Sequence, residues 1–531
     1  MSDKIKQYQN ELKNGVLPRR EFIKLATAAG ISSTALGSLM LSGSAHAETP
    51  KRGGRLIVGV AASQQNNSID PAHYFSDSDL LRGHALYDKL IDRAPDMKPI
   101  PQLALSWESN EDASKWIFKL RKGVTFHDGK KFGPEDVIYS FQHHLGKKSE
   151  SPAKAYFSQI KEMKKLDDHT VEFILAAPNA DFPIILSDTR AGIFSDGYTD
   201  FTKTTNGTGP FMVKEFKPGS TYIFKRNPNY WGSNGPYVDE IEYIGIGDPT
   251  ARVNALLSGD IDLMMDLDPK TASLIERSKI TNLLRAKSGQ HSGLAMMLDR
   301  KPTSDNNVRL AMKYAIDREM ILKNIYKDYG HIGNDHPISP IDPYYNSEIP
   351  QRSYDPDKAR FYIKKAGLEN KPLNVYSSSV SGAGSTPSCE LLQETAKAGG
   401  IDLKLHKVPA DSYWTTTWQK KPMCTTNWAG RPVPDLIFSL VYKSGASYNE
   451  TAWKNKKFDK LLIEARSIKD FNKRKTMYGE MQNMLQEEGG LIVMSFVDVL
   501  DASNKKVKGI TPHASGPLGF YQFATTAWID S

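Results

Sequence analysis

The sequence is poor in the features that specialised protein classes require. Only two of its 531 residues are cysteine, Cys389 and Cys424, which excludes a disulfide framework and a cysteine-based zinc cluster but leaves one bond open. With 69 Lys+Arg against 61 Asp+Glu, the formal net charge is only +8, so no block of charge points to nucleic acid. Hydrophobic residues make up 39% of the chain, which excludes disordered, collagenous and coiled-coil proteins, and the mean hydropathy of −0.48 predicts a soluble protein.

Catalytic and metal-binding signatures are lacking as well. The chain has no phosphate-binding loop, no dinucleotide fingerprint, no H-E-x-x-H and no G-x-S-x-G. His143 and His144 are adjacent on a predicted helix and point about 100° apart, so they would chelate a metal poorly. His331 and His336 flank a polar loop, where we expect solvated side chains. The aspartates between residues 260 and 268 alternate with apolar residues, which favours a short strand over a calcium loop.

The first 47 residues have the pattern of an export signal. A charged start is followed by a weakly apolar run over residues 25–41 and by the small-residue site Ala45-His46-Ala47. The run is too polar for a membrane span, which needs about 20 mostly apolar residues. The segment RREFIK at residues 19–24 resembles a twin-arginine signal, although Pro18 stands where Ser or Thr is usual. We therefore predict export to the periplasm by the twin-arginine pathway; the alternative is an ordinary basic amphipathic N-terminus.

The rest of the chain mixes strand and helix patterns without an internal repeat. Apolar or alternating runs predict strands over residues 55–60 and 116–121. Asp248-Pro249 supplies an N-cap and a first-turn proline for a helix that Gly259 ends, and the same pattern recurs from Asp355-Pro356 to Gly367. These patterns predict an α/β protein, and the length predicts more than one folding unit because single cores stop growing near 250 to 300 residues.

Five segments, in the same order along the chain, carry a resemblance to a known family. The first contains the Gly-Val-x-Phe-His-Asp-Gly turn at residues 123–129, between a strand and a helix start. Together the segments are similar to bacterial extracellular solute-binding proteins of family 5, the substrate-binding components of peptide, nickel and opine ABC transporters. They are residues 116–137, 207–232, 248–262, 308–318 with 354–359, and 427–438 with 448–462.

The resemblance implies a periplasmic-binding-protein type II-like α/β fold, with two α/β lobes, a hinge and an inserted third domain. Ligand would lie between the lobes, and a monomeric, cofactor-free protein would deliver a peptide or small-molecule solute to membrane permease subunits. The implied domains after the signal are lobe I at 48–97, 205–300 and 495–531, the inserted domain at 98–204, and lobe II at 301–494.

One position departs from the family pattern. Peptide-binding relatives carry Trp-x-x-Asp, whose carboxylate pairs with the ligand's amino group, whereas this chain reads Trp428-Ala429-Gly430-Arg431. A guanidinium suits a carboxylate or phosphate, so Arg431 favours a solute with an anionic group, such as an opine-like conjugate or a modified peptide. The alternative is an internal pair, for example with Asp435. Trp428 is expected either to form the cleft wall or to pack in the core.

Weaker candidates complete the predicted site. Gln64, Gln65 and Asn66 follow the first strand, where loops commonly face a ligand. Trp414 belongs to an aromatic cluster that lines the pocket or simply packs. Cys389 and Cys424 either stay free or pair in the oxidising periplasm.

Two rival functions stay open beside solute binding by this family. One is a binder of a nickel or haem chelate with the same fold. The other is an exported hydrolase, because the twin-arginine route often carries cofactor proteins.

Overall fold

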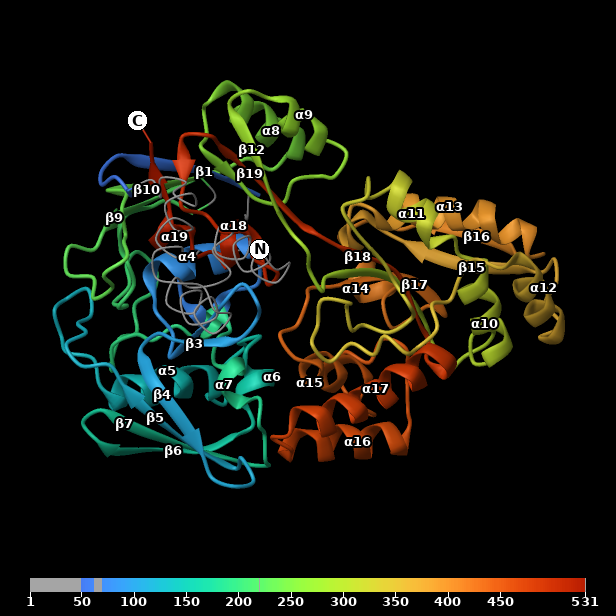
Figure 1. Cartoon of the computed structure of the whole chain (residues 1–531), viewed down its shortest axis with the longest axis horizontal. Coiled ribbons are helices and arrows are strands. Elements are labelled where there is room, and N and C mark those ends of the chain that lie inside the picture. Colours follow the sequence, from blue (N-terminus) through green and yellow to red (C-terminus); the bar gives the residue numbers. More distant parts are fainter. Residues whose placement is uncertain (1–48, 62–68, 219, 531) are drawn as a thin grey trace, which may run out of the picture. The chain divides into compact units, whose positions relative to one another are not determined.

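The computed structural model describes residues 49–61, 69–218 and 220–530. The predicted signal at residues 1–47 and the candidates Gln64, Gln65 and Asn66 lie outside these residues. From Arg52 onward the chain forms one compact unit, built on three large sheets (Figure 1). None of the helices within the described ranges is both long and apolar enough to cross a bilayer.

The first sheet has seven strands in the order β12-β19-β11-β1-β10-β9-β8. Strand β1 spans the six residues predicted for it, Arg55–Val60, and lies parallel to β10 and β11. All other neighbours in this sheet are antiparallel. The other strands are β8 (Phe211–Phe216), β9 (Thr221–Arg226), β10 (Glu240–Gly245), β11 (Leu263–Met264), β12 (Thr281–Ala286) and β19 (Val499–Asn504).

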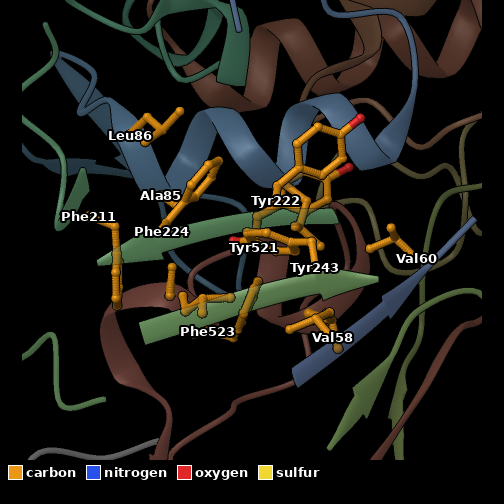
Figure 2. Close-up of a cluster of buried hydrophobic side chains, with 14 of the residues drawn as sticks. Val58, Val60, Ala85, Leu86, Phe211, Tyr222, Phe224, Tyr243, Tyr521 and Phe523 are labelled. Atoms are coloured by element: carbon orange, nitrogen blue, oxygen red, sulfur yellow. The ribbon is translucent and has the colours of Figure 1, made fainter. Parts of the chain in front are cut away.

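Both faces of the first sheet are covered. On one face, helix α4 (Asp77–Leu86) and the C-terminal α18 (Pro517–Phe520) and α19 (Phe523–Thr526) pack on β1, β9 and β10. Figure 2 shows the buried side chains of this core, among them Val58, Phe224 and Tyr243, filling the space next to α4. On the other face, α8 (Pro249–Ser258) and α9 (Ala272–Arg277) pack on β11 and β19.

A four-stranded antiparallel sheet, called the third sheet below, has the order β4-β5-β7-β6 and lies within residues 104–175. Trp116, Phe118 and Leu120 of β5 (Lys115–Leu120) are buried on one face, which confirms the predicted alternation. Helix α5 (Pro134–Leu145) contributes Val137 and Phe141 to the same core. The other elements here are β4 (Ala104–Ser109), α6 (Lys154–Phe157), β6 (Ile160–Asp167), β7 (Thr170–Leu175), α7 (Phe182–Ile185) and the short helix η2 (Thr189–Ala191).

The second sheet has six strands in the order β14-β18-β13-β17-β15-β16. One helical layer contains α10 (Asn306–Ala315), α12 (Pro356–Lys365) and α13 (Ser385–Ala398). A second core contains α15 (Pro434–Ile437), η4 (Phe438–Tyr442), α16 (Lys456–Ser467) and α17 (Phe471–Glu488). The strands and remaining helices are β13 (His291–Met296), α11 (Arg318–Asn324), β14 (Gly330–Ile332), β15 (Pro372–Ser377), β16 (Asp402–Lys407), α14 (Tyr413–Thr416), β17 (Met423–Trp428) and β18 (Leu491–Val497).

Helix starts follow the local signals in the sequence. The Asp248 carboxylate accepts the Ala251 N–H at 2.7 Å, and Gly259 ends that helix with φ 86°. Asp355 caps α12 in the same way through the Lys358 N–H at 2.9 Å. Both helices therefore begin and end where capping chemistry predicts.

The chain passes between the first and second sheets twice, and both passages are short. Residues 287–290 link β12 to β13, and Asp498 alone separates β18 from β19. The side chain of Asp498 is buried and pairs with Arg285 Nε of β12 at 2.6 Å. Strand β13 hydrogen-bonds with β17 and β18, so the chain enters the second sheet ahead of the boundary predicted at residue 301. The division into two lobes and an inserted domain otherwise stays a prediction.

Candidate functional site

A cavity of about 580 Å³ is lined by residues from the parts of the molecule built on the first, second and third sheets. Helix α4 and the end of β1 contribute one wall, and residues between 152 and 190 around α6, α7 and η2 contribute a second. The loop after β17, residues 428–432, contributes a third. The volume is in the range of small-molecule sites, and the walls come from segments far apart in the sequence, so this cleft is the candidate ligand site.

Arg431 lines this cleft without an internal charge partner. Its Nη1 donates one long hydrogen bond, of 3.4 Å, to the carbonyl oxygen of Ala429, and its buried Nε has no hydrogen-bond partner among the described residues. Asp435 instead accepts Nε of Arg466 at 2.7 Å. The internal Arg431–Asp435 pair that the sequence left open is not formed in the structure.

A second guanidinium faces the same cavity. Arg93, at the end of β2 (Ile91–Arg93), is buried and donates from Nε to Ser187 Oγ at 2.7 Å and from Nη1 to Ser515 Oγ at 3.2 Å. Burial, opposed by Asp188 and Asp92 and reinforced by the charge of Arg431, lowers its pKa to about 10. Two like charges held near each other attract an anionic group that can bridge them.

The remaining arginine of the cleft is already neutralised. Arg190 Nη1 lies 3.1 Å from both carboxylate oxygens of Asp188. Burial opposes ionisation of Asp188, but Arg190, Arg93 and Arg431 together hold the pKa of this carboxyl below its usual value. Arg93 and Arg431 are thus the arginines of the cleft that form no direct ion pair within the described chain, and Asp188 interacts with both electrostatically.

An acidic wall faces the cleft from the first sheet. Asp77 begins α4 and accepts the Tyr521 hydroxyl, while Asp266 follows β11. The Asp266 side chain reaches solvent in the cleft but is ringed by protein atoms, and this enclosure together with Asp77 raises its pKa to about 7. Asp501 lies beneath, buried, and its pKa is raised to about 8 by burial and by Asp266 and Asp77. The cleft thus has separate positive and negative regions.

Trp428 lines the cleft and also packs against the neighbouring hydrophobic core, so it combines its two predicted positions. Its indole lines the cavity, and its Nε1 donates to Glu450 Oε1 at 3.0 Å. Trp414 lines a smaller neighbouring chamber, which shares Trp428 and Tyr448 with the cleft. The structure therefore brings Trp428 and Arg431 to one cavity and places Trp414 next to it.

The two cysteines are buried free thiols, so the disulfide considered from the sequence is not formed. Cys389 on α13 interacts with the Ser377 hydroxyl, whereas Cys424 on β17 interacts with Tyr413. Each sulfur thus has its own partner. Burial raises the pKa of both thiols to about 12, which makes them unreactive.

The histidines considered as metal ligands contact protein side chains instead. His143 Nε2 lies 2.9 Å from Asp70, and His144 Nδ1 lies 2.7 Å from Ser151 Oγ. His336 is fully buried, contrary to the solvated loop position expected for it, and its ring lies 5.7 Å from that of Tyr345. Within the described part of the chain, no three His, Cys, Asp or Glu side chains gather as a metal site.

Sequence reasoning missed two residues of the site. Arg93 sits in a three-residue strand with no motif, and its place in the cleft depends on Ser515, more than 400 positions away. Glu450 lies in a turn, and only the fold brings it behind Trp418 and Trp428. No local sequence pattern indicates that Arg93 or Glu450 belongs to the site.

Comparison with known proteins supports a shared ancestry over most of the chain. The family model described as "Bacterial extracellular solute-binding proteins, family 5 Middle" matches residues 98–450. The dipeptide-binding protein of Escherichia coli (strain K12) is 28% identical over 82% of this chain and 88% of its own length. Heme-binding protein A of Haemophilus influenzae is 26% identical over 82% of this chain and 86% of its own length.

Solved structures share the fold. The periplasmic binding protein DppA of Helicobacter pylori, in complex with the peptide STSA, superposes with a TM-score of 0.78 at 25% identity, covering 91% of this chain and 99% of that one. The fold is therefore that of type II periplasmic binding proteins, as the resemblance implied.

Proposed function

Since the chain belongs to the bacterial extracellular solute-binding proteins of family 5, we propose that it captures a peptide or peptide-like solute with an anionic group for an ABC importer. The observation that carries the proposal is the pair of guanidinium groups, Arg93 and Arg431, which face the cleft without ion-paired carboxylates in the described chain. A ligand carboxylate or an opine-like acid would accept hydrogen bonds from Arg431 in the bidentate geometry that guanidinium favours.

Capture would involve closure of the cleft. The two passages between the sheets, residues 287–290 and Asp498, are short enough to act as a hinge. Trp428 and Arg431 come from the second-sheet part, Asp77 comes from α4 on the first sheet, and Arg93 comes from β2, which belongs to neither of these two sheets. A ligand that contacts both sets would favour the closed state, in which membrane permease subunits receive the solute.

The test compares two matched dipeptides, Ala-Glu and Ala-Gln, by calorimetry. A charge-assisted hydrogen bond contributes roughly 1.5–3 kcal/mol, so we expect Ala-Glu to bind about 10- to 100-fold more tightly than Ala-Gln. Arg431→Gln should remove this preference, whereas Lys397→Gln, on the exposed surface of α13, should keep it. Equal affinities of wild type and Arg431→Gln for both peptides would remove Arg431 from the ligand site, because both peptides also carry a C-terminal carboxylate.

Two further measurements separate the rival functions. Mass spectrometry of the small molecules released on denaturation would identify a co-purified solute, and metal analysis of protein purified without chelators would reveal a nickel or haem chelate by stoichiometric metal. Hydrolysis of Ala-Glu during prolonged incubation would indicate an enzyme instead of a transport protein.

We also propose that residues 1–47 direct export to the periplasm through the twin-arginine pathway. The basis is the RREFIK segment with the apolar run and Ala45-His46-Ala47 behind it. Replacing Arg19 and Arg20 together by Lys should stop export of the protein in a fractionation assay. Unchanged export of the double variant would contradict this route.

A further inference from the structure

A chamber beside the cleft is built almost entirely of aromatic rings. It measures about 330 Å³ and is lined by Trp414, Trp418, Trp428 and Tyr448 together with Thr426 and Asn427. Neighbouring rings stand nearly perpendicular or tilted, with centroids 5.7 Å apart for Trp414–Trp418, 5.9 Å for Trp418–Tyr448 and 6.0 Å for Trp428–Tyr448. Trp414 and Tyr448 remain 40% and 44% exposed, which is unfavourable for large rings unless something covers them.

A buried carboxylate holds two of these rings in place. Glu450 is fully buried and accepts Trp418 Nε1 at 2.8 Å, Trp428 Nε1 at 3.0 Å and the Thr426 hydroxyl at 2.6 Å. An indole N–H can only donate, so these bonds fix the N–H edges toward Glu450. The carbon surfaces of both indoles are left to line the chamber.

The carboxylate has no cationic partner among the described residues. Its polar contacts within the described chain are these three hydrogen bonds, and burial raises its pKa while the three donors oppose that shift. A buried carboxylate without a counter-ion is costly, and one that carries charge creates a negative field behind the rings.

The rings themselves also lack a cation. Lysine and arginine side chains of the described chain stack on other aromatic rings, but on none of the four that line the chamber. Aromatic faces are electron-rich and attract ammonium groups, most strongly where several rings surround them. The ring faces therefore favour a cationic occupant.

We propose that this aromatic chamber binds a positively charged alkylammonium group of the solute. The proposal deepens, and for its biological meaning rests on, the proposed solute-binding function. Because Trp428 and Tyr448 line both the chamber and the cleft, one solute can place its anionic group at Arg431 and its ammonium group between the rings. The solute would then be zwitterionic. Its anionic group would lie at Arg431, the position where relatives with the Trp-x-x-Asp pattern bind the ligand's amino group.

The test measures the binding of choline and of its uncharged isostere 3,3-dimethylbutan-1-ol by tryptophan fluorescence and calorimetry. Cation–π contacts of the measured range correspond to a roughly 2- to 30-fold preference for the cation. Tyr448→Leu, which keeps an apolar side chain at an exposed position, should lower that preference about 2- to 5-fold because one of the four rings is lost, while Phe361→Leu on exposed α12 should leave it unchanged. Glu450→Gln should weaken choline binding more than binding of the isostere, and thermal melting checks that this buried variant folds.

Three outcomes would overturn the proposal: equal affinity for the two probes, saturation by neither, or an unchanged choline preference in Tyr448→Leu. If Glu450→Gln does not fold, the exposed Tyr448→Leu variant alone decides. Choline carries no acid, so Arg431→Gln should retain the choline preference. A failed acidic-peptide test with an intact choline preference would thus reject the anionic-solute function and leave the ammonium site standing.

Discussion

The buried ion cluster around Asp335 allows a stability prediction with a defined magnitude. The Asp335 carboxylate is fully buried, and its two oxygens accept Arg318 Nη2 at 2.5 Å and Arg352 Nε at 3.1 Å. Lys313 lies nearby with its pKa lowered to about 7 by burial, an effect that Asp335 opposes and Arg352 reinforces. Asp335→Asn removes the negative charge while conserving the shape of the side chain.

The backbone should tolerate this change. Asp335 has φ 61°, in the left-handed region that asparagine adopts readily, so the variant isolates the loss of charge. Removing one partner of a buried pair costs about 3–5 kcal/mol because the other charge stays buried without compensation. Arg318 loses its carboxylate partner, whereas Arg352 keeps its pair with Glu487 Oε1 at 2.9 Å, so we expect a destabilisation of about 3–4 kcal/mol, at the lower end of that range.

Urea denaturation at pH 7, followed by circular dichroism, measures the effect as the shift of the midpoint multiplied by the slope. The control is Glu394→Gln in the exposed pair Lys397–Glu394, which should change the free energy of unfolding by less than about 1 kcal/mol. A change below about 1 kcal/mol for Asp335→Asn would refute the reasoning, since it would mean that the two arginines find other compensation.

Two further predictions concern Asp501 beneath the cleft wall and the close approach of Gly207 to the backbone of Leu86. The folded-state pKa of Asp501, about 8, lies above its unfolded value, so the folded protein binds the proton more tightly and stability falls as pH rises from about 4 to about 8. Unfolding measured at pH 5 and pH 8.5 should show that Asp501→Asn gains stability relative to wild type at the higher pH; a pH-independent difference would contradict this. In Gly207→Ala, the new Cβ would lie 2.1 Å from the carbonyl oxygen of Leu86. Thermal melting should show a loss of about 1–3 kcal/mol or more, whereas Gly146→Ala, with its nearest contact at 3.7 Å, should be nearly neutral.

Local structure was predictable where the signals lie within a few residues. Asp248, Pro249 and Gly259 specify α8 through bonds that span at most four positions. The alternation of Trp116, Phe118 and Leu120 likewise predicts which face of β5 is buried. The family pattern extends this to Arg431, because it reveals a charge reversal at one position.

The site as a whole could not be read in this way. The chemistry of Arg431 depends on whether Asp435 pairs with it, and Arg466, 31 positions further along, takes that carboxylate instead. The solvated role expected for His336 also failed because burial is decided by packing from distant segments.

The order of elements, the α/β class, the helix caps and the unusual arginine after Trp428 are properties of the sequence alone, because they rest on near neighbours and on side-chain periodicity. The cleft, the unpaired state of Arg93 and Arg431, and the aromatic chamber held by Glu450 arise only in the tertiary structure. The physical reason is that burial and charge compensation depend on which distant side chains meet, and contacts such as Arg93 with Ser515 leave no trace in local sequence.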